Sequence, residues 1–128
     1  MAGTNRLVAV VIEVSDLERS ARLYRDAFAL DLHASDHDRS DDRWTGGPHA
    51  ATSWTDGAFL HFALYAAKAD GPSKGLQVAF SVDDIEQAHA RAVAARAEVL
   101  HGPRDEPWGR SARYQDPDGN VIELTQRR

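Results

Sequence analysis

The sequence predicts a single α+β domain of 128 residues, built from two copies of one unit that runs strand, helix, then three strands. Two observations support this prediction. A β-branched apolar stretch followed by an amphipathic helix occurs twice, starting at Leu7 and at Leu76. Turn signals that join short strands follow each helix. A chain of this length can bury a core as one domain.

The first unit begins with a buried strand from Leu7 to Val14 and continues as a helix. Ser15-Asp-Leu-Glu18 has the spacing of a capping box, with Ser15 as the cap. One apolar helix face then follows and ends near Ala29: Leu17, Ala21, Tyr24 and Phe28.

The rest of the first unit is predicted as a loop and a hairpin. The segment 31–43 carries five aspartates and reads as a short strand followed by a solvated loop, with a turn at 44–48. Two strands, 50–55 and 58–65, are joined at Asp56-Gly57, a hairpin signal.

The second unit repeats this order. A strand spans 76–82, and Asp83-Asp-Ile-Glu86 is a second capping box. The following helix has a face of small residues, and a short strand is predicted at Val99 to His101. Turn residues around Pro103 and Pro107 precede a final hairpin of strands 110–115 and 120–125.

The two units align with each other. Val14-Ser-Asp-Leu-Glu18 matches Val82-Asp-Asp-Ile-Glu86 at an offset of 68, and Asp56-Gly57 matches Asp118-Gly119 at an offset of 62. The domain 1–128 therefore divides into module one (about 7–65), a linker (66–75) and module two (about 76–125).

Composition narrows the possible functions. The net charge of −5 argues against nucleic acid as a partner, because nucleic-acid-binding proteins carry basic patches. The chain has no cysteine, which removes disulfides and thiolate chemistry and fits a reducing cytoplasm. It has neither a secretory leader nor a membrane-length apolar run, so we expect a cytoplasmic protein without a membrane partner.

These segments resemble the vicinal oxygen chelate superfamily, which includes glyoxalases, bleomycin-resistance proteins and dioxygenases. The similarity lies in 14–24, in Phe80-Ser-Val-Asp-Asp84, and in Pro107-Trp-Gly-Arg110 through Asp116-Pro-Asp-Gly-Asn-Val-Ile-Glu-Leu124. It implies two βαβββ modules whose mixed sheet curves, incompletely closed, into a U around a cavity, with the helices outside. It also implies a small-molecule ligand and a homodimer.

In metal-using members, each module supplies one ligand from its first strand and one from its last. Transferred by motif position, this gives Ala9 and His61 from module one, and Gln77 and Glu123 from module two. Strand alternation would place Phe59 and Tyr65 on the cavity side with His61, while Glu13 adds a carboxylate to that wall.

Ala9 cannot coordinate a metal, and a neutral glutamine is a poor donor. The resemblance therefore leaves two hypotheses. The first is a metal-free protein that binds or sequesters a ligand such as an antibiotic. The second is a lyase, isomerase or dioxygenase that uses Fe, Mn, Ni, Zn or Mg held by His61, Gln77 and Glu123. Under the second hypothesis the candidate catalytic groups are His61, Glu123 and His49, the last as a general base.

Large aromatic side chains near the expected cavity mouth suit a planar ligand. The candidate ligand-binding residues are Trp44, Trp54, Phe59, Tyr65, Trp108, Arg110 and Glu13, with Arg113 as a further cation. The other histidines have simpler interpretations. His33 and His37 fall in the aspartate-rich loop, His89 on the second helix, and His101 at a strand end.

Overall fold

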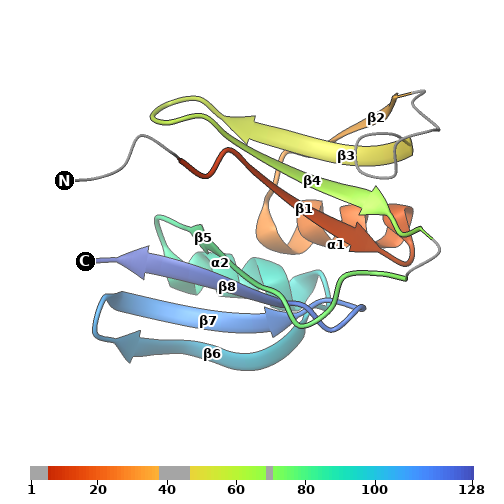
Figure 1. Cartoon of the computed structure of the whole chain (residues 1–128). Helices are drawn as coiled ribbons and strands as arrows, with labels where there is room; N and C mark the ends of the chain where they lie inside the picture. The colour runs from red at the N-terminus through yellow and green to blue at the C-terminus, as the bar shows by residue number, and fades with distance from the viewer. Residues whose placement is uncertain (1–5, 38–46, 69–70) are drawn as a thin grey trace.

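The structure is a computed structural model that describes residues 6–37, 47–68 and 71–128 (Figure 1). Its elements follow the predicted order in both modules. Module one contains β1 (Ala9–Val14), α1 (Leu17–Phe28), β2 (His33–His37), β3 (Gly47–Trp54) and β4 (Leu60–Ala66). Module two contains β5 (Gln77–Ser81), α2 (Ile85–Ala94), β6 (Glu98–Glu106), β7 (Gly109–Gln115) and β8 (Val121–Arg127).

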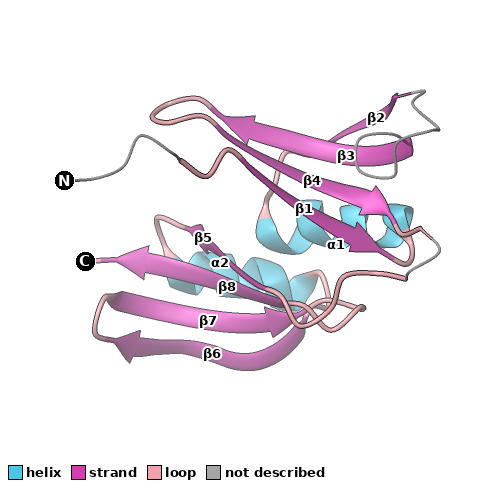
Figure 2. Cartoon of the chain, in the orientation of Figure 1, coloured by secondary structure: helices cyan, strands magenta, loops and turns pink. Residues whose placement is uncertain are grey.

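Each module folds its strands into one mixed sheet. The strand orders are β1-β4-β3-β2 and β5-β8-β7-β6, with the first pair of each sheet parallel and the other pairs antiparallel. The prediction of an α+β fold with two βαβββ modules is confirmed. The helices pack on one face of the sheets and against each other (Figure 2). We call the opposite face of each sheet its helix-free face.

Both helices begin one residue later than the capping-box prediction. The N-caps are Asp16 and Asp84, not Ser15 and Asp83, so those two predicted caps were wrong. The Asp16 carboxylate accepts a hydrogen bond from the Arg19 backbone N–H at 3.0 Å. A carboxylate at the N-cap also interacts favourably with the positive end of the helix dipole, so aspartate stabilises both helix starts.

β2 is the short strand predicted at the start of the aspartate-rich segment, and His33 and His37, which were expected in the loop, are its first and last residues. β6 spans nine residues instead of the three predicted. The chain accommodates Pro103 in β6 at a register shift between His101 and Arg104, where the ladder is already interrupted. Of the predicted turn at 44–48, residues 44–46 lie outside the described residues, and Gly47 and Pro48 are the first residues of β3 instead.

The core is shared by the two modules. Phe62 of β4 packs edge-on against Phe80 of β5 with ring centroids 5.4 Å apart, and Phe28 of α1 meets Tyr114 of β7 at 5.5 Å. Because each of these pairs joins one module to the other, the two repeats bury their apolar faces together.

Asp116, in the turn between β7 and β8, links the modules through polar contacts. Its buried carboxylate accepts the Tyr24 hydroxyl at 2.8 Å and the Asn120 amide at 3.1 Å. It also accepts the backbone N–H groups of Asp118 and Asn120. The Asn120 amide in turn donates to the Ser73 carbonyl, which fixes the linker to this turn.

Candidate functional site

The helix-free face of module two carries a row of charged and polar side chains. Strand pairing places Ala79 of β5 beside Glu123 of β8, Glu123 beside Arg113 of β7, and Arg113 beside His101 of β6. We call these four residues the module-two row. Their neighbours along the strands on either side face the helices and belong to the core, among them Ile122, Leu124, Ala112 and Tyr114.

An ion pair occupies the centre of this row. The Arg113 Nε donates to Glu123 Oε1 at 2.9 Å. The glutamate side chain is 8% exposed, whereas the arginine side chain is 30% exposed. The carboxylate is therefore covered and neutralised by the guanidinium, while the guanidinium itself still reaches the surface.

The sequence could have indicated this pair. Arg113 and Glu123 lie five residues on either side of Asp118 in the predicted hairpin, so they oppose each other across the two strands. Sequence analysis considered the arginine as a cation for a ligand but did not connect it to the glutamate. His101 was expected at a strand end and lies within β6.

Two polar atoms on this face lack partners within the described part of the chain. The His101 Nδ1 lies 2.8 Å from the Gly102 carbonyl and donates to it. The His101 Nε2 is buried without a hydrogen-bond partner, as is the Ser111 hydroxyl one row further along β7. Buried polar atoms of this kind normally bind water or a ligand.

The corresponding row of module one contains no acid. Val11 and Ala79 each precede the N-cap of the following helix by five residues, so they occupy equivalent positions. Val11 lies beside Ala63, and Ala63 lies beside Ala51. The strand register thus places Ala63 at the level that Glu123 has in module two. His61, which the turn offset related to Glu123, lies one row away.

His61 has its own cross-strand partner on β3. Its Nδ1 lies 2.8 Å from the Ser53 hydroxyl, and its ring is parallel to that of Phe59 with centroids 6.5 Å apart. Phe59 is half exposed, and Ala9 is the neighbour of His61 on β1. This end of the helix-free face therefore presents two aromatic rings next to a small residue.

Tyr65, His49 and Glu13 form the row at the other end of the module-one face. The Tyr65 and His49 rings stack at 4.4 Å with an interplanar angle of 9°. Glu13 is the β1 neighbour of Tyr65, and its carboxylate accepts the backbone N–H of Lys68 at 3.4 Å. His49 and Tyr65 are both buried. The His49 imidazole, the predicted general base, is therefore packed against Tyr65 and not exposed at the surface.

A narrow apolar slot lies where the two modules meet. It has a volume of about 170 Å³ and brings Trp54 and His61 of module one next to Ala79 and Phe80 of module two. Trp54 packs at 6.2 Å against Phe80 and belongs to the helix side of β3. The slot is smaller than the 300 to 1,000 Å³ that is typical of drug-sized ligands, so in one chain it can hold only part of such a molecule.

The predicted metal ligands do not converge. Gln77 is exposed and pairs with Val121, one row away from Glu123, while His61 and Glu123 each have other side-chain partners. Among the described residues, no group of three histidine, aspartate or glutamate side chains has the arrangement of a metal site. This donor set does not fit a divalent metal, which needs at least three free protein ligands in catalytic sites.

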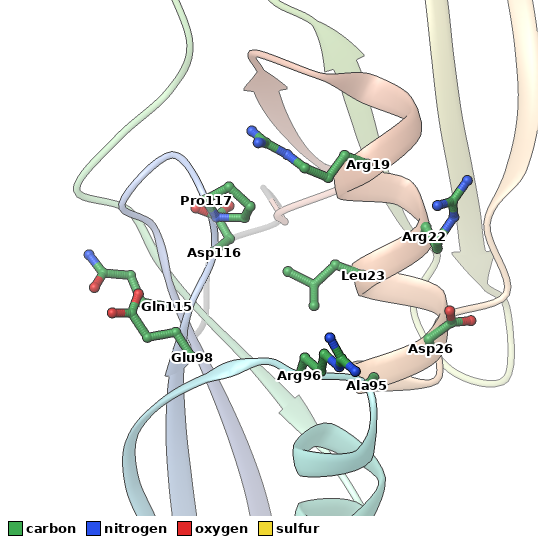
Figure 3. Close-up of a pocket in the computed structure, with 10 residues that line it drawn as sticks. All are labelled: Arg19, Arg22, Leu23, Asp26, Ala95, Arg96, Glu98, Gln115, Asp116 and Pro117. Carbon is green, nitrogen blue, oxygen red and sulfur yellow. The ribbon is translucent and has the colours of Figure 1, made fainter.

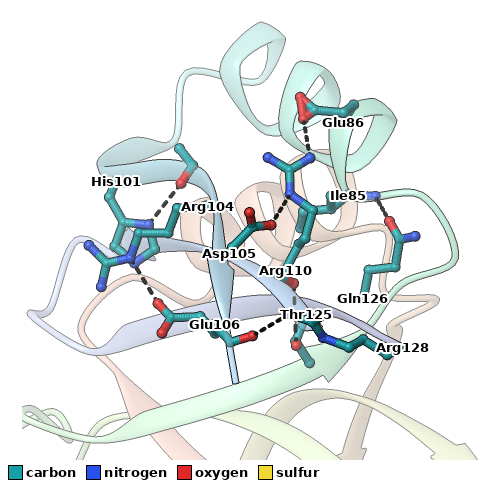
Figure 4. Close-up of polar contacts among 11 residues, drawn as sticks. Ile85, Glu86, His101, Arg104, Asp105, Glu106, Arg110, Thr125, Gln126 and Arg128 are labelled. Carbon is teal, nitrogen blue, oxygen red and sulfur yellow. Dashed lines mark hydrogen bonds and ion pairs between the residues drawn. The ribbon is translucent and has the colours of Figure 1, made fainter. Parts of the chain in front are cut away.

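The remaining predicted site residues lie away from these rows. Arg110 is on the helix side of β7, where it forms exposed ion pairs with Glu86 of α2 at 3.3 Å and Asp105 of β6 at 3.2 Å (Figure 4). Trp108 is 40% exposed in the β6–β7 turn. At Gly109 a side chain would collide with the Gln126 carbonyl, so the Trp-Gly sequence there serves the turn. Trp44 lies outside the described residues.

A further cavity is lined by none of the row residues. It has a volume of about 410 Å³ and lies between α1, the end of α2 and the β7–β8 turn (Figure 3). Three arginines (Arg19, Arg22 and Arg96) and three acids (Asp26, Glu98 and Asp116) line it, so its charges balance. None of the residues predicted for the site reaches it.

Comparison with known proteins identifies the class of protein. Residues 6–124 match the Glyoxalase/Bleomycin resistance protein/Dioxygenase superfamily, and the chain belongs to that superfamily. No curated protein matches it.

Solved structures show the same fold. TnmS3, an antibiotic binding protein from Streptomyces sp. CB03234, is 27% identical, and the match covers all of both chains with a TM-score of 0.74. A glyoxalase/bleomycin resistance protein from the same organism is 29% identical over 94% of this chain and all of its own, with a TM-score of 0.71. TioX from Micromonospora sp. ML1 has a TM-score of 0.66 at 20% identity, with 97% of this chain and all of TioX covered.

In the part of the chain that the structure describes, no helix is long and apolar enough to span a membrane.

Proposed function

We propose that this protein binds a small, planar molecule on its helix-free faces without a metal ion, as an antibiotic-binding or ligand-sequestering protein. The observation that carries the proposal is the 2.9 Å ion pair between Arg113 and Glu123. Glu123, a predicted metal ligand, is bound by the Arg113 guanidinium. An arginine held in this way can recognise a ligand, whereas a carboxylate already paired with it is a poor metal ligand.

The relatives support the same proposal. TnmS3 is an antibiotic binding protein, and its similarity to this chain extends over the full length of both. The aromatic rings of Phe59 and His61 on the helix-free face, with Trp54 at the module seam, would supply the flat contact surface that a planar ligand requires.

We further propose that a second copy of the chain covers the helix-free faces. Val11 is 45% exposed in the middle of β1, and Ala79 is exposed in the middle of β5. Apolar residues in the middle of strands are usually buried, so a homodimer that covers them would also enlarge the small slot into a drug-sized cavity. Sedimentation equilibrium tests this part of the proposal, because a monomer at micromolar concentration would contradict it.

The alternative function is a metal-dependent lyase, isomerase or dioxygenase. It would require the Arg113 guanidinium to leave Glu123 and would require His61 to give up its contact with Ser53. We therefore place it second.

Tryptophan fluorescence tests the proposed function. A panel of planar aromatic compounds, charged and neutral, is titrated into the protein after treatment with a chelator. Saturable quenching that weakens in Trp54→Phe and in Phe59→Ala is expected, and Leu100→Ala, an exposed residue of β6, serves as the matched control. If no planar compound binds, or if binding appears only after a divalent metal is added, the proposal is wrong.

A further inference from the structure

The guanidinium of Arg113 is paired with a carboxylate that was expected to bind a metal ion. Its partner Glu123 is the last-strand ligand implied by the family resemblance, and the carboxylate contacts the arginine instead of being free for a cation. A site of this kind keeps a positive charge on the helix-free face while it changes the source of that charge from a metal to a side chain.

The contact with Glu123 uses the Nε–H group of the Arg113 guanidinium and leaves its two Nη groups. Nε donates to Glu123, and no hydrogen bond of Nη1 or Nη2 is found among the described residues. The side chain is 30% exposed, so its outer edge is accessible. Two parallel N–H groups on one planar edge match two acceptor oxygens held side by side, as in a carboxylate.

The neighbours of the guanidinium favour a flat ligand. Ala79 on β5 carries no bulk over the Glu123 position and is exposed, so a ring can approach from the module seam. That seam is the apolar slot with Trp54 and His61. The slot is too small for a whole ligand, and Ala79 belongs both to its lining and to the module-two row, two strands from Arg113.

We infer that Arg113 takes the place of the metal in this protein and selects ligands that carry a carboxylate, or an equivalent pair of acceptor oxygens, on an aromatic ring. This inference rests on the proposed function and deepens it, because it names the group that the site recognises. Arg113 is then a binding residue, and Glu123 is its ionic partner.

The test compares an acid with its ester. The probes are 1-hydroxy-2-naphthoate and its methyl ester, titrated by calorimetry into the full chain treated with chelator. We expect the acid to bind at least tenfold more tightly than the ester, which is about 1.4 kcal/mol. Arg113→Gln should remove this preference, and Arg113→Lys should recover part of it because lysine keeps the charge but loses the fork.

Arg110→Gln is the matched control, since it removes the same charge from the helix side of the same strand and should leave the preference unchanged. Circular dichroism and melting temperatures verify that the variants fold.

Equal binding of acid and ester, or an unchanged preference in Arg113→Gln, would overturn the inference and leave the proposed function intact. Failure of the acid to bind at all would also overturn it. If neutral planar compounds fail as well, the proposed function falls with it.

Discussion

The two modules share one backbone plan but differ in what their helix-free faces carry. At the same distance from the helix N-caps, module one has Val11, Ala63 and Ala51 side by side, while module two has Ala79, Glu123 and Arg113. The first row is small and apolar up to His33 of β2, which pairs with Ala51 as His101 pairs with Arg113. The second is an ion pair beside a partly buried imidazole.

This difference between the modules shows that the two faces of each sheet have different roles, one in folding and one in the site. The residues that face the helices are apolar in both modules, because both must bury them. The residues on the other face are free of that constraint. Module one uses them for stacked rings and module two for charge, so a ligand that meets both faces would meet an aromatic surface and a cation.

The largest expected effect concerns the turns that end the two hairpins. Asp116→Ala removes the acceptor of four hydrogen bonds and should lower the free energy of unfolding by about 3 kcal/mol. Asp56→Ala changes the exposed turn of module one and should cost less than about 0.5 kcal/mol. Urea denaturation measures both. Similar losses in the two variants would show that the turns do not differ in this way.

The next effect compares the cross-strand pairs of the two faces. Arg113→Ala leaves the Glu123 carboxylate covered and without its cation, which should cost about 2 kcal/mol. Ser53→Ala removes the partner of His61 at a more exposed position and should cost less than about 1 kcal/mol. Thermal and urea unfolding give the two values, and a reversed order would refute the contrast between a charged and a neutral face.

Alkaline pH should act on the core tyrosines of both modules. Burial, followed by the charge of Glu86, raises the pKa of Tyr114 from 10.0 to about 12. Burial and then the Asp116 charge raise the pKa of Tyr24 further. Because the folded state favours the protonated phenol, this stability is present below pH 10 and is lost as the pH rises through the folded-state pKa.

We therefore expect the melting temperature to fall above pH 10, and to fall less steeply in Tyr114→Phe. Melting curves between pH 9 and pH 12 measure this. A flat profile in the wild-type protein would contradict the assignment.

The smallest effect contrasts two arginines of β7. Arg110→Ala breaks exposed ion pairs with Glu86 and Asp105 and should change the free energy of unfolding by less than about 0.5 kcal/mol. The same substitution at Arg113 is expected to cost several times more. Equal losses of unfolding free energy in the two variants would show that the partly buried Arg113–Glu123 pair is no more stabilising than the exposed pairs of Arg110.

Sequence patterns predicted the fold well because periodicity and the repeat depend on short spacings. The alternation that placed His61 and Tyr65 on one face of their strand holds, since the residues between and beside them, Phe62 and Leu64, are buried against the helices. The sequence could not predict that His61 and Glu123 occupy different rows of their sheets. Their rows depend on the registers of β4 against β1 and of β8 against β5. Nor could the sequence predict the long β6, whose bulges accommodate Pro103.

The candidate site was predicted only in part for the same reason. A list of side chains on one face does not say which are adjacent, and adjacency decides whether Glu123 meets a metal or a guanidinium.

Metal content tests the central claim most directly. Untagged protein is purified without added metal, analysed for divalent ions, and then titrated with Zn²⁺, Mn²⁺ and Ni²⁺ while its melting temperature is followed, with Glu123→Gln in parallel. We expect well under one ion per chain and no rise in melting temperature, because Arg113 already neutralises Glu123. A full equivalent of metal that is lost in Glu123→Gln would contradict the account and make the metal-dependent enzyme the better description.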